Sequence, residues 1–322
     1  MPFSTIAGTG GYLPERVMPN KEFEALVSTS DEWIQDRTGI KQRHIAADDE
    51  TTSDMALAAG NRAIEAAGVT AQDIDLIIIA TTTPDKVFPS TACIVQRRLG
   101  IHNIPVFDIG AACAGFMFAL DVADRFIHTE GASCVLVIGA ETYSRIIDWT
   151  DRTTCVLFGD GAGAVVLKAS DKPGIMSTHI HADGEFEELL HVPAGISSGY
   201  ETVQKQAAFI QMKGNEVFKK AVSTLGAIAL ETLEANNLQK SDLTWLVPHQ
   251  ANLRIITAAA KKLKMPLERT IITVDRHANT SSASIPLALD IGVRDGRIKR
   301  GDLLLLEAFG AGLTWGSALV RY

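Results

Sequence analysis

Apolar and polar positions follow one pattern that occurs twice along the chain. In the first half, an amphipathic stretch at residues 53–67 predicts a helix, and an acidic turn separates it from a continuous apolar run at 73–80. In the second half, a helical stretch at 216–235 and a second acidic turn precede the apolar run at 241–247. Continuous apolar runs of this kind are typical of strands buried on both faces. We therefore expect a duplicated α/β unit.

Each half also closes on a glycine-rich apolar stretch that contains Phe-Gly-x-Gly. The first covers residues 157–167 and the second covers residues 308–320. A turn at 171–174 lies between the halves, so we place an N-terminal half at 1–170 and a C-terminal half at 171–322. No linker is long enough to suggest that the halves are independent domains.

The glycine clusters at 8–11 and 159–163 need a test against dinucleotide binding. Pro14 follows the first cluster closely and leaves no helix start for a pyrophosphate, and the second cluster leads into a strand. Both patterns are more typical of tight strand bends or close backbone packing. A nicotinamide cofactor is therefore not expected.

Composition narrows the classes of function. The 322-residue chain is 46% hydrophobic and carries a formal net charge of −8. This acidic balance argues against wholesale nucleic-acid binding. No apolar run approaches the roughly 18 residues that a membrane span needs, and the first residues lack the basic segment of a signal peptide. We expect a cytoplasmic protein without membrane association.

The chain contains four cysteines, at positions 93, 113, 134 and 155. None belongs to a C-x-x-C pair or has a histidine at metal-ligand spacing, so no metal site is expected. Three of them lie in apolar runs that are typical of reduced core residues. Cys113 instead stands between an extended run at 104–109 and a helical run at 115–128. Amide groups and the dipole at a helix N-terminus favour a thiolate, which predicts a nucleophile at neutral pH.

Two later segments offer partners for this thiol. His249 follows a short apolar strand that begins at Trp245, and Asn279 lies in a loop of small polar residues after a predicted strand at 270–274. Strand ends are where α/β folds build sites. Taken alone, His249 is equally compatible with a structural histidine, and Asn279 is better explained as a helix cap. The functional interpretation depends on the three residues as a set.

Together these segments resemble β-ketoacyl-acyl-carrier-protein synthase III, the ketosynthase family that starts bacterial type II fatty-acid synthesis. The likeness covers nearly the whole chain. Its motifs are Thr29-Ser30-Asp31-Glu32-Trp33-Ile34, Arg37-Thr38-Gly39-Ile40, the Cys113 segment, Phe158-Gly159-Asp160-Gly161-Ala162-Gly163, His249-Gln250-Ala251-Asn252, Asn279-Thr280-Ser281 and Phe309-Gly310-Ala311-Gly312. The resemblance implies a thiolase-like duplicated fold with α-β-α-β-α layers, and a homodimer. Asn279 in the third position resembles the initiating class, because elongating ketosynthases use two histidines; chalcone-synthase-like enzymes share Cys-His-Asn.

The family's reaction is a decarboxylative Claisen condensation of an acyl-CoA with malonyl-acyl-carrier-protein. The resemblance makes Cys113 the nucleophile that holds the acyl group, and makes His249 and Asn279 the donors to the enolate that forms when carbon dioxide leaves. It assigns the oxyanion hole to the backbone N–H groups of Cys113 and Ala311. Many relatives carry glycine at the latter position, and alanine would be strained if a positive φ were required.

The resemblance also predicts a tunnel for coenzyme A, whose thioester is a substrate, with no cofactor. Trp33 and Arg152 are expected to sandwich the adenine, and Arg37 to contact a phosphate, because indole and guanidinium groups stack on bases and arginine pairs with phosphate. The other expected tunnel positions are Thr29, Gly214, Asn215, Phe218, Ala251 and Asn252. Phe88 is expected to close the acyl pocket from the partner subunit.

Basic residues gather in one stretch of this acidic chain and predict where the acidic acyl carrier protein docks. Arg254, Lys261 and Lys262 are spaced to share one helix face, and Lys219 precedes them. A local basic patch steers an acidic partner. An ordinary solvated face explains each lysine equally well when it is taken singly.

Other functions share parts of this pattern. A ketosynthase-like starter enzyme or acyltransferase of secondary metabolism would use the same three residues with another acceptor. A Cys-His-Asn hydrolase would turn over peptides or simple thioesters without malonyl, and would not need Trp33, Arg37 and Arg152. A non-catalytic binding module leaves the polar strand ends unexplained. The sequence leaves the acyl chain of the primer open.

Overall fold

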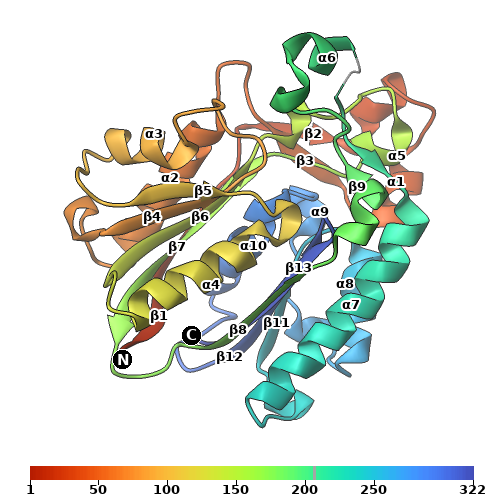
Figure 1. Ribbon diagram of the computed structural model, residues 1–322. Helices are drawn as coiled ribbons and strands as arrows, with labels where there is room; N and C mark the ends of the chain where they lie inside the picture. Colours follow the sequence, from red (N-terminus) through yellow and green to blue (C-terminus); the bar gives the residue numbers. More distant parts are fainter. Residues whose placement is uncertain (206–207) are drawn as a thin grey trace.

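The computed structural model describes residues 1–205 and 208–322, and its first sheet has five strands (Figure 1). Their order across the sheet is β1 (Phe3–Tyr12), β7 (Gly161–Ser170), β6 (Cys134–Glu141), β4 (Leu76–Ala80) and β5 (Val106–Ile109). β4 runs parallel to both of its neighbours, whereas β7 is antiparallel to β1 and β6. Every residue of β4 and β6 is buried, as the continuous apolar runs predict for strands covered on both faces.

The second sheet has four strands and repeats the same arrangement in the C-terminal part of the chain. Their order is β11 (Trp245–Pro248), β12 (Leu303–Gly310), β13 (Thr314–Arg321) and β8 (Ile175–Ala182). β11 is parallel to β12, and the other pairs are antiparallel. The first sheet therefore uses strands from residues 3–170, and the second uses strands from residues 175–321.

Two helices form the layer between the sheets. α4 (Gly115–His128) packs on β4 and β6 on one side and on β8 and β13 on the other, and α10 (Ser284–Arg294) packs on β1 and β7. The main core lies here, with Phe116 and Leu120 of α4 and Leu289 of α10 buried against residues of both sheets. Figure 1 shows both helices between the two sheets.

Helices also cover the outer face of each sheet. α2 (Thr52–Ala66) and α3 (Thr91–Arg98) pack on the first sheet, and α7 (Gly214–Ala235) and α8 (Leu253–Lys262) cover the second (Figure 1). α2 begins at a capping box, in which the Thr51 hydroxyl accepts from the Asp54 N–H and the Asp54 carboxylate accepts from the Thr51 N–H. The order of layers is helix, sheet, helix, sheet, helix, as the family resemblance implied.

Shorter elements complete the chain. They lie near one another at the upper right of Figure 1. They are β2 (Arg16–Pro19), α1 (Asp31–Thr38), β3 (Gln42–Ile45), α5 (Arg152–Cys155), β9 (Leu190–His191), α6 (Tyr200–Lys205) and β10 (Gln211–Met212).

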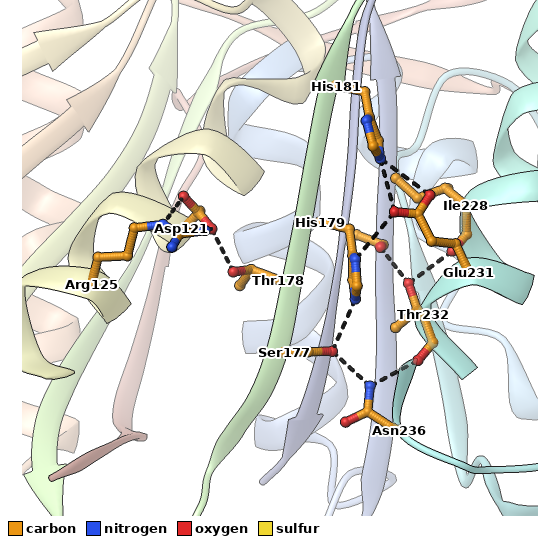
Figure 2. A network of polar contacts seen from close by, with 11 residues as sticks. Asp121, Arg125, Ser177, Thr178, His179, His181, Ile228, Glu231, Thr232 and Asn236 are labelled. Carbon is orange, nitrogen blue, oxygen red and sulfur yellow. Dashed lines mark hydrogen bonds and ion pairs between the residues drawn. The ribbon is translucent and has the colours of Figure 1, made fainter. Parts of the chain in front are cut away.

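The edge strand β8 connects the central helix layer to the outer one through alternate side chains (Figure 2). Thr178 points to α4 and donates to Asp121 at 2.5 Å. His179 and His181 point the other way and contact the Glu231 carboxylate of α7 at 3.2 Å and 3.0 Å. This alternation follows from the two-residue period of a strand.

The predicted strand at 270–274 is wrong. Thr270 forms a single bridge with Leu246, and Val274 already begins the short helix α9 (Val274–His277). The Gln250 side chain gives the reason, because its oxygen accepts from the N–H groups of Thr273 at 2.8 Å and Val274 at 3.1 Å. A side chain thus satisfies backbone groups that a neighbouring strand would otherwise satisfy.

Candidate active site

Cys113 lies in the 3-10 turn η3 (Ala112–Ala114), directly before α4 and after β5. The thiol is buried, and the residue is only 5% exposed. The preceding residue, Ala112, has a φ of 44°, a left-handed conformation that costs energy for a residue with a Cβ. The predicted corner between strand and helix is therefore present, and it is a tightly constrained one.

The pKa of Cys113 departs from the sequence-based expectation of a thiolate. Burial raises the pKa of this thiol to about 12, and the nearby Glu141 carboxylate raises it further. Hydrogen bonds from Ser281 and Asn279 act in the opposite direction but do not cancel the effect of burial. Desolvation of the charged form is the largest of these effects. A thiol with this pKa is protonated at neutral pH, so its attack on a thioester requires a proton acceptor.

His249 follows β11, and its backbone N–H donates to Glu307 O at 2.8 Å. Its Nδ1 lies 2.6 Å from the Ser284 Oγ, and that oxygen also accepts from the Gln250 N–H at 3.3 Å. The Ser284 proton is then free to point at Nδ1, which leaves the proton of the neutral ring on Nε2. Burial lowers the pKa of His249 to about 3, so the ring is neutral at pH 7.

Asn279 stands between α9 and the 3-10 turn η9 (Ser281–Ala283). Its Oδ1 accepts from the Ser281 N–H at 2.8 Å, which leaves the carboxamide NH₂ for the cavity that Asn279 and Cys113 both line, and this side chain lowers the pKa of the Cys113 thiol. Thr280, the N-cap residue of η9, makes no capping bond with its side chain, and Asn279 instead accepts from the first N–H of this turn. The flanking residues Ala278 and Ser281 have φ values of 57° and 50°, so this loop is strained like the turn at Cys113.

One cavity, of about 80 Å³, is lined by all three of these side chains. Four of the predicted tunnel residues line it too, namely Gly214, Phe218, Ala251 and Asn252. Asn252 also caps α8, because its Oδ1 accepts from the Ile255 N–H at 2.9 Å. Three segments that are distant in sequence therefore meet at one void, with a thiol, an imidazole and a carboxamide on its wall.

A second cavity, of about 240 Å³, adjoins Cys113 and is mostly apolar. Ile146, Phe158 and Ile210 are among its lining residues, as are Tyr143 and Ala311. Because both cavities include Cys113, the sulfur sits where they meet.

Ala311 does not adopt the positive φ that would strain an alanine. The Thr314 hydroxyl contacts its carbonyl oxygen at 2.9 Å and that of Ala111 at 3.1 Å, which ties this loop to the turn that carries Cys113. The expected strain is thus absent here, and positive φ values occur instead beside Cys113 and Asn279.

The residues predicted to hold adenine lie together. The Arg152 guanidinium carbon is 4.6 Å from the centre of the Trp33 ring, and that of Arg37 is 5.9 Å from it. Arg152 also donates to Ser28 O at 2.7 Å. The guanidinium occupies the face on which a base would stack, so it has to swing away before an adenine can be sandwiched.

Several predicted residues lie away from the two cavities. Thr29, Trp33, Arg37 and Arg152 are not among the residues that line either one, and Asn215 is an exposed residue in the first turn of α7.

Phe88 does not line the second cavity. It is 82% exposed and borders a surface hollow instead. That hollow shares Thr82 and Ile146 with the second cavity.

The predicted basic residues are exposed on α7 and α8, which lie side by side in Figure 1. The Arg254 guanidinium carbon lies 5.2 Å from the ring of Phe218, which lines the first cavity. The Lys262 stem runs over Gly226 of α7. Lys219 and Lys261 are both exposed. The basic surface therefore borders the first cavity.

Sequence reasoning missed a buried polar network beside the thiol. Glu141, at the end of β6, is fully buried and bonds to residues that include Ser281 and Ser282. Its signal in the sequence is a single acidic residue at the end of a long apolar run. Ser284, which holds His249, gave no signal beyond its place in a serine-rich segment.

No cluster of three or more His, Cys, Asp or Glu side chains suited to a metal ion occurs within residues 1–205 and 208–322. Among the helices of that same part of the chain, none is long and apolar enough to cross a membrane.

The layered fold, with a cysteine before the central helix α4, defines a thiolase-like condensing enzyme. Residues 107–184 match the family model described as 3-Oxoacyl-[acyl-carrier-protein (ACP)] synthase III, and residues 233–322 match the model of its C-terminal part. The Beta-ketoacyl-[acyl-carrier-protein] synthase III of Thioalkalivibrio sulfidiphilus is 64% identical over 322 residues, which are 100% of each chain. The chain therefore belongs to the 3-oxoacyl-[acyl-carrier-protein] synthase III family, which confirms the predicted family.

Solved structures support the same assignment. The 3-oxoacyl-[acyl-carrier-protein] synthase III of Aquifex aeolicus VF5 has a TM-score of 0.94 at 48% identity, and the match covers 99% of this chain and 100% of that one. The priming beta-ketosynthase from the R1128 polyketide biosynthetic pathway has a TM-score of 0.94 at 39% identity, with 99% and 96% covered. These likenesses confirm the predicted fold class and the prediction of an acyltransferase-type ketosynthase.

Proposed function

We propose that this chain condenses an acyl-CoA with malonyl-acyl-carrier-protein, with loss of carbon dioxide, through an acyl group held on Cys113. The observation that carries the proposal is the single cavity lined by Cys113, His249 and Asn279. Membership of the synthase III family supports the reaction and its place at the start of fatty-acid synthesis. Thioester exchange and decarboxylation need no metal or redox cofactor, and we place the enzyme in the cytoplasm.

In the first half-reaction, the Cys113 sulfur takes the acyl group from CoA. The acyl chain then occupies the apolar cavity of about 240 Å³ beside the sulfur. The N–H groups of Cys113 and Ala311 stabilise the oxyanion that forms on the acyl carbonyl. Ala311 lines this cavity with an unstrained backbone, which is compatible with that role.

In the second half-reaction, the malonyl thioester enters the first cavity, whose polar lining includes the neutral His249 imidazole and the Asn279 carboxamide. The His249 Nε2–H and the Asn279 NH₂ donate to the thioester oxygen as carbon dioxide leaves and the oxygen gains charge. The described residues that line this cavity include no charged side chain, so nothing there repels the malonyl carboxylate. Losing one such donor typically slows a reaction by about 10²- to 10³-fold.

Coenzyme A and the acyl carrier protein bind to different groups of residues around the site. CoA stacks its adenine between Trp33 and Arg152 after Arg152 has swung away, with Arg37 on a phosphate. The acidic carrier protein docks on Lys219, Arg254, Lys261 and Lys262, which border the first cavity. The enzyme is a homodimer in which the partner's Phe88 closes the acyl cavity.

Three variants test the proposal by separating the half-reactions. Cys113→Ser is expected to carry no acetyl group after acetyl-CoA is added, as measured by intact-protein mass spectrometry. His249→Ala and Asn279→Ala are expected to become acetylated but to release carbon dioxide from malonyl-acyl-carrier-protein at least about 100-fold more slowly than wild type. Acetylation that persists in Cys113→Ser would exclude Cys113 as the acyl carrier.

A second candidate is a starter enzyme of secondary metabolism. The likeness to a priming beta-ketosynthase of a polyketide pathway favours it. Product analysis with several acyl-CoA primers and acceptors separates the two: preference for malonyl-acyl-carrier-protein with acetyl-CoA supports fatty-acid synthesis. Turnover of simple thioesters without malonyl would instead indicate a hydrolase.

A further inference from the structure

Glu141 is a fully buried carboxyl group beside the thiol that the proposed reaction does not use. Its oxygens accept from the Thr83 hydroxyl at 2.7 Å, the Thr82 N–H at 3.1 Å and the Ser282 hydroxyl at 3.1 Å. These donors come from the segment after β4 and from η9. A carboxyl group buried this deeply and bonded this fully is fixed in one position.

Ser281 connects this carboxyl group to the nucleophile. Its hydroxyl lies 3.3 Å from Glu141 Oε1 and 2.9 Å from the Tyr143 hydroxyl. The turn η9 that carries Ser281 packs on the turn η3 that carries Cys113, and the Ser281 side chain lowers the pKa of the Cys113 thiol. The ionisable groups that face Glu141 are Cys113 and Tyr143, and burial raises the pKa of both. Both are therefore neutral at pH 7, and Glu141 is the base of the network.

We propose that Glu141 takes the proton of the Cys113 thiol through the Ser281 hydroxyl when the acyl group is loaded. The inference rests on the proposed function, because it assumes that Cys113 carries the acyl group. Glu141 acts through Ser281 and does not touch the substrate.

The proton and the electron pairs balance through both half-reactions. The thiol proton passes to the Ser281 oxygen while the Ser281 proton passes to Glu141. The sulfur then bonds to the acyl carbon, the bond from that carbon to the CoA sulfur breaks, and the CoA thiolate takes a proton from solvent. In the condensation, Cys113 leaves the acyl carbon as a thiolate and regains its proton from Glu141 through Ser281.

His249 is a poorer acceptor for this proton. With the Ser284 hydroxyl donating to Nδ1, the proton of the neutral ring is on Nε2, and the ring then has no free lone pair for the thiol proton. Burial lowers the pKa of His249 to about 3, whereas burial raises that of Glu141 to about 7. Transfer to Glu141 also leaves the number of buried charges unchanged, because the negative charge moves from the carboxylate to the sulfur.

The test compares Glu141→Gln and Ser281→Ala with Ser282→Ala. Ser282 bonds to Glu141 but lies outside the relay, so its variant is the matched control. The rate of Cys113 acetylation is measured by quenched mixing and intact mass from about pH 5.5 to about pH 8.5. We expect a rise centred near pH 7 in wild type, and in Ser282→Ala the same rise displaced to higher pH, because the hydrogen bond from Ser282 lowers the pKa of Glu141. Glu141→Gln and Ser281→Ala should lose this rise and react at least about tenfold more slowly at pH 7.5.

The wild type and the three variants are also assayed for decarboxylation of malonyl-acyl-carrier-protein. This second measurement distinguishes a proton-relay role of Glu141 and Ser281 from a purely structural role. Decarboxylation needs no proton from the thiol, so it should stay within about threefold of wild type in all variants. Loss of both activities in Glu141→Gln, or wild-type acetylation with an unchanged pH profile, overturns the relay. A wild-type enzyme that is never acetylated at Cys113 would instead overturn the proposed function.

Discussion

Gly310 allows β12 to pass close to the turn that carries the nucleophile, so Gly310→Ala tests how closely that turn must be placed. A Cβ built at Gly310 would lie 2.8 Å from the Cys113 nitrogen and 3.0 Å from both the Ala114 nitrogen and the Cys113 Cβ. Ordinary contacts of a Cβ begin near 3.4 Å, so the turn and the strand must separate by about half an ångström. The φ of Gly310 is not in the left-handed region, so backbone strain adds nothing to the effect.

The displacement affects the atoms that matter for acylation. It moves the Cys113 amide, which we place in the oxyanion hole, together with the sulfur. Misplacement by 1 Å costs about 100-fold in rate, so half that distance predicts a loss of roughly tenfold. Overpacking of the buried turn is also expected to lower the free energy of unfolding by about 1 to 3 kcal/mol.

The assay is the single-turnover rate of Cys113 acetylation, measured with the free energy of unfolding in urea. Gly184→Ala is the matched control, because its Cβ would meet no atom within 4 Å and its φ is not in the left-handed region. It should acetylate like wild type. A Gly310→Ala enzyme that acetylates within twofold of wild type would refute the argument, because the turn would then tolerate the movement that we take to be costly.

Three further predictions concern neighbouring groups. Ser284→Ala removes the partner of His249 Nδ1 and should slow malonyl decarboxylation about tenfold while acetylation stays unchanged, a split that rapid-mixing assays of both steps would reveal. Trp33→Ala should raise the KM for acetyl-CoA about fivefold to twentyfold with little change in kcat; an unchanged KM would remove Trp33 from the CoA site. Burial raises the pKa of Glu307 to about 8, and neither carboxyl oxygen has a partner among the described residues. The folded chain therefore holds this proton more tightly than the unfolded chain, and stability falls as pH rises from about 4.5 to about 8. Glu307→Gln should remove the contribution of this group, so that the slope becomes less steep and about 3 kcal/mol is gained at pH 7 in urea unfolding; equal slopes in both proteins would contradict it.

The sequence predicted the elements that carry the site because their signals are local. The apolar run after residue 73 became β4, and the helical run at 115–128 became α4 with the same ends. The failed strand at 270–274 had a local pattern too. Its backbone groups are satisfied by Gln250, however, and a contact between segments about twenty residues apart leaves no periodicity to detect.

The protonation state of the Cys113 thiol could not be predicted from the sequence, for a related reason. The helix terminus at Cys113 is a local feature, so it was visible. The burial that raises the pKa of the thiol depends on segments that pack around it from both halves of the chain. Glu141 is a similar case, since one acidic residue at the end of an apolar run does not reveal which buried group it will face.

The position of the Glu141 carboxyl group relative to the thiol fits both half-reactions. Glu141 contacts the network behind Cys113, whereas the described lining of the first cavity carries no charge. A malonyl carboxylate that enters this cavity gives up water and finds no cation, which destabilises it relative to the enolate, whose charge spreads onto an oxygen facing two N–H donors. A carboxylate on the tunnel side would repel the malonyl group, and a lysine there would stabilise the carboxylate that has to be lost. The base that we propose for the thiol therefore lies outside the lining of the first cavity, where the malonyl group is expected, and its bonding partner Thr82 borders the second cavity instead.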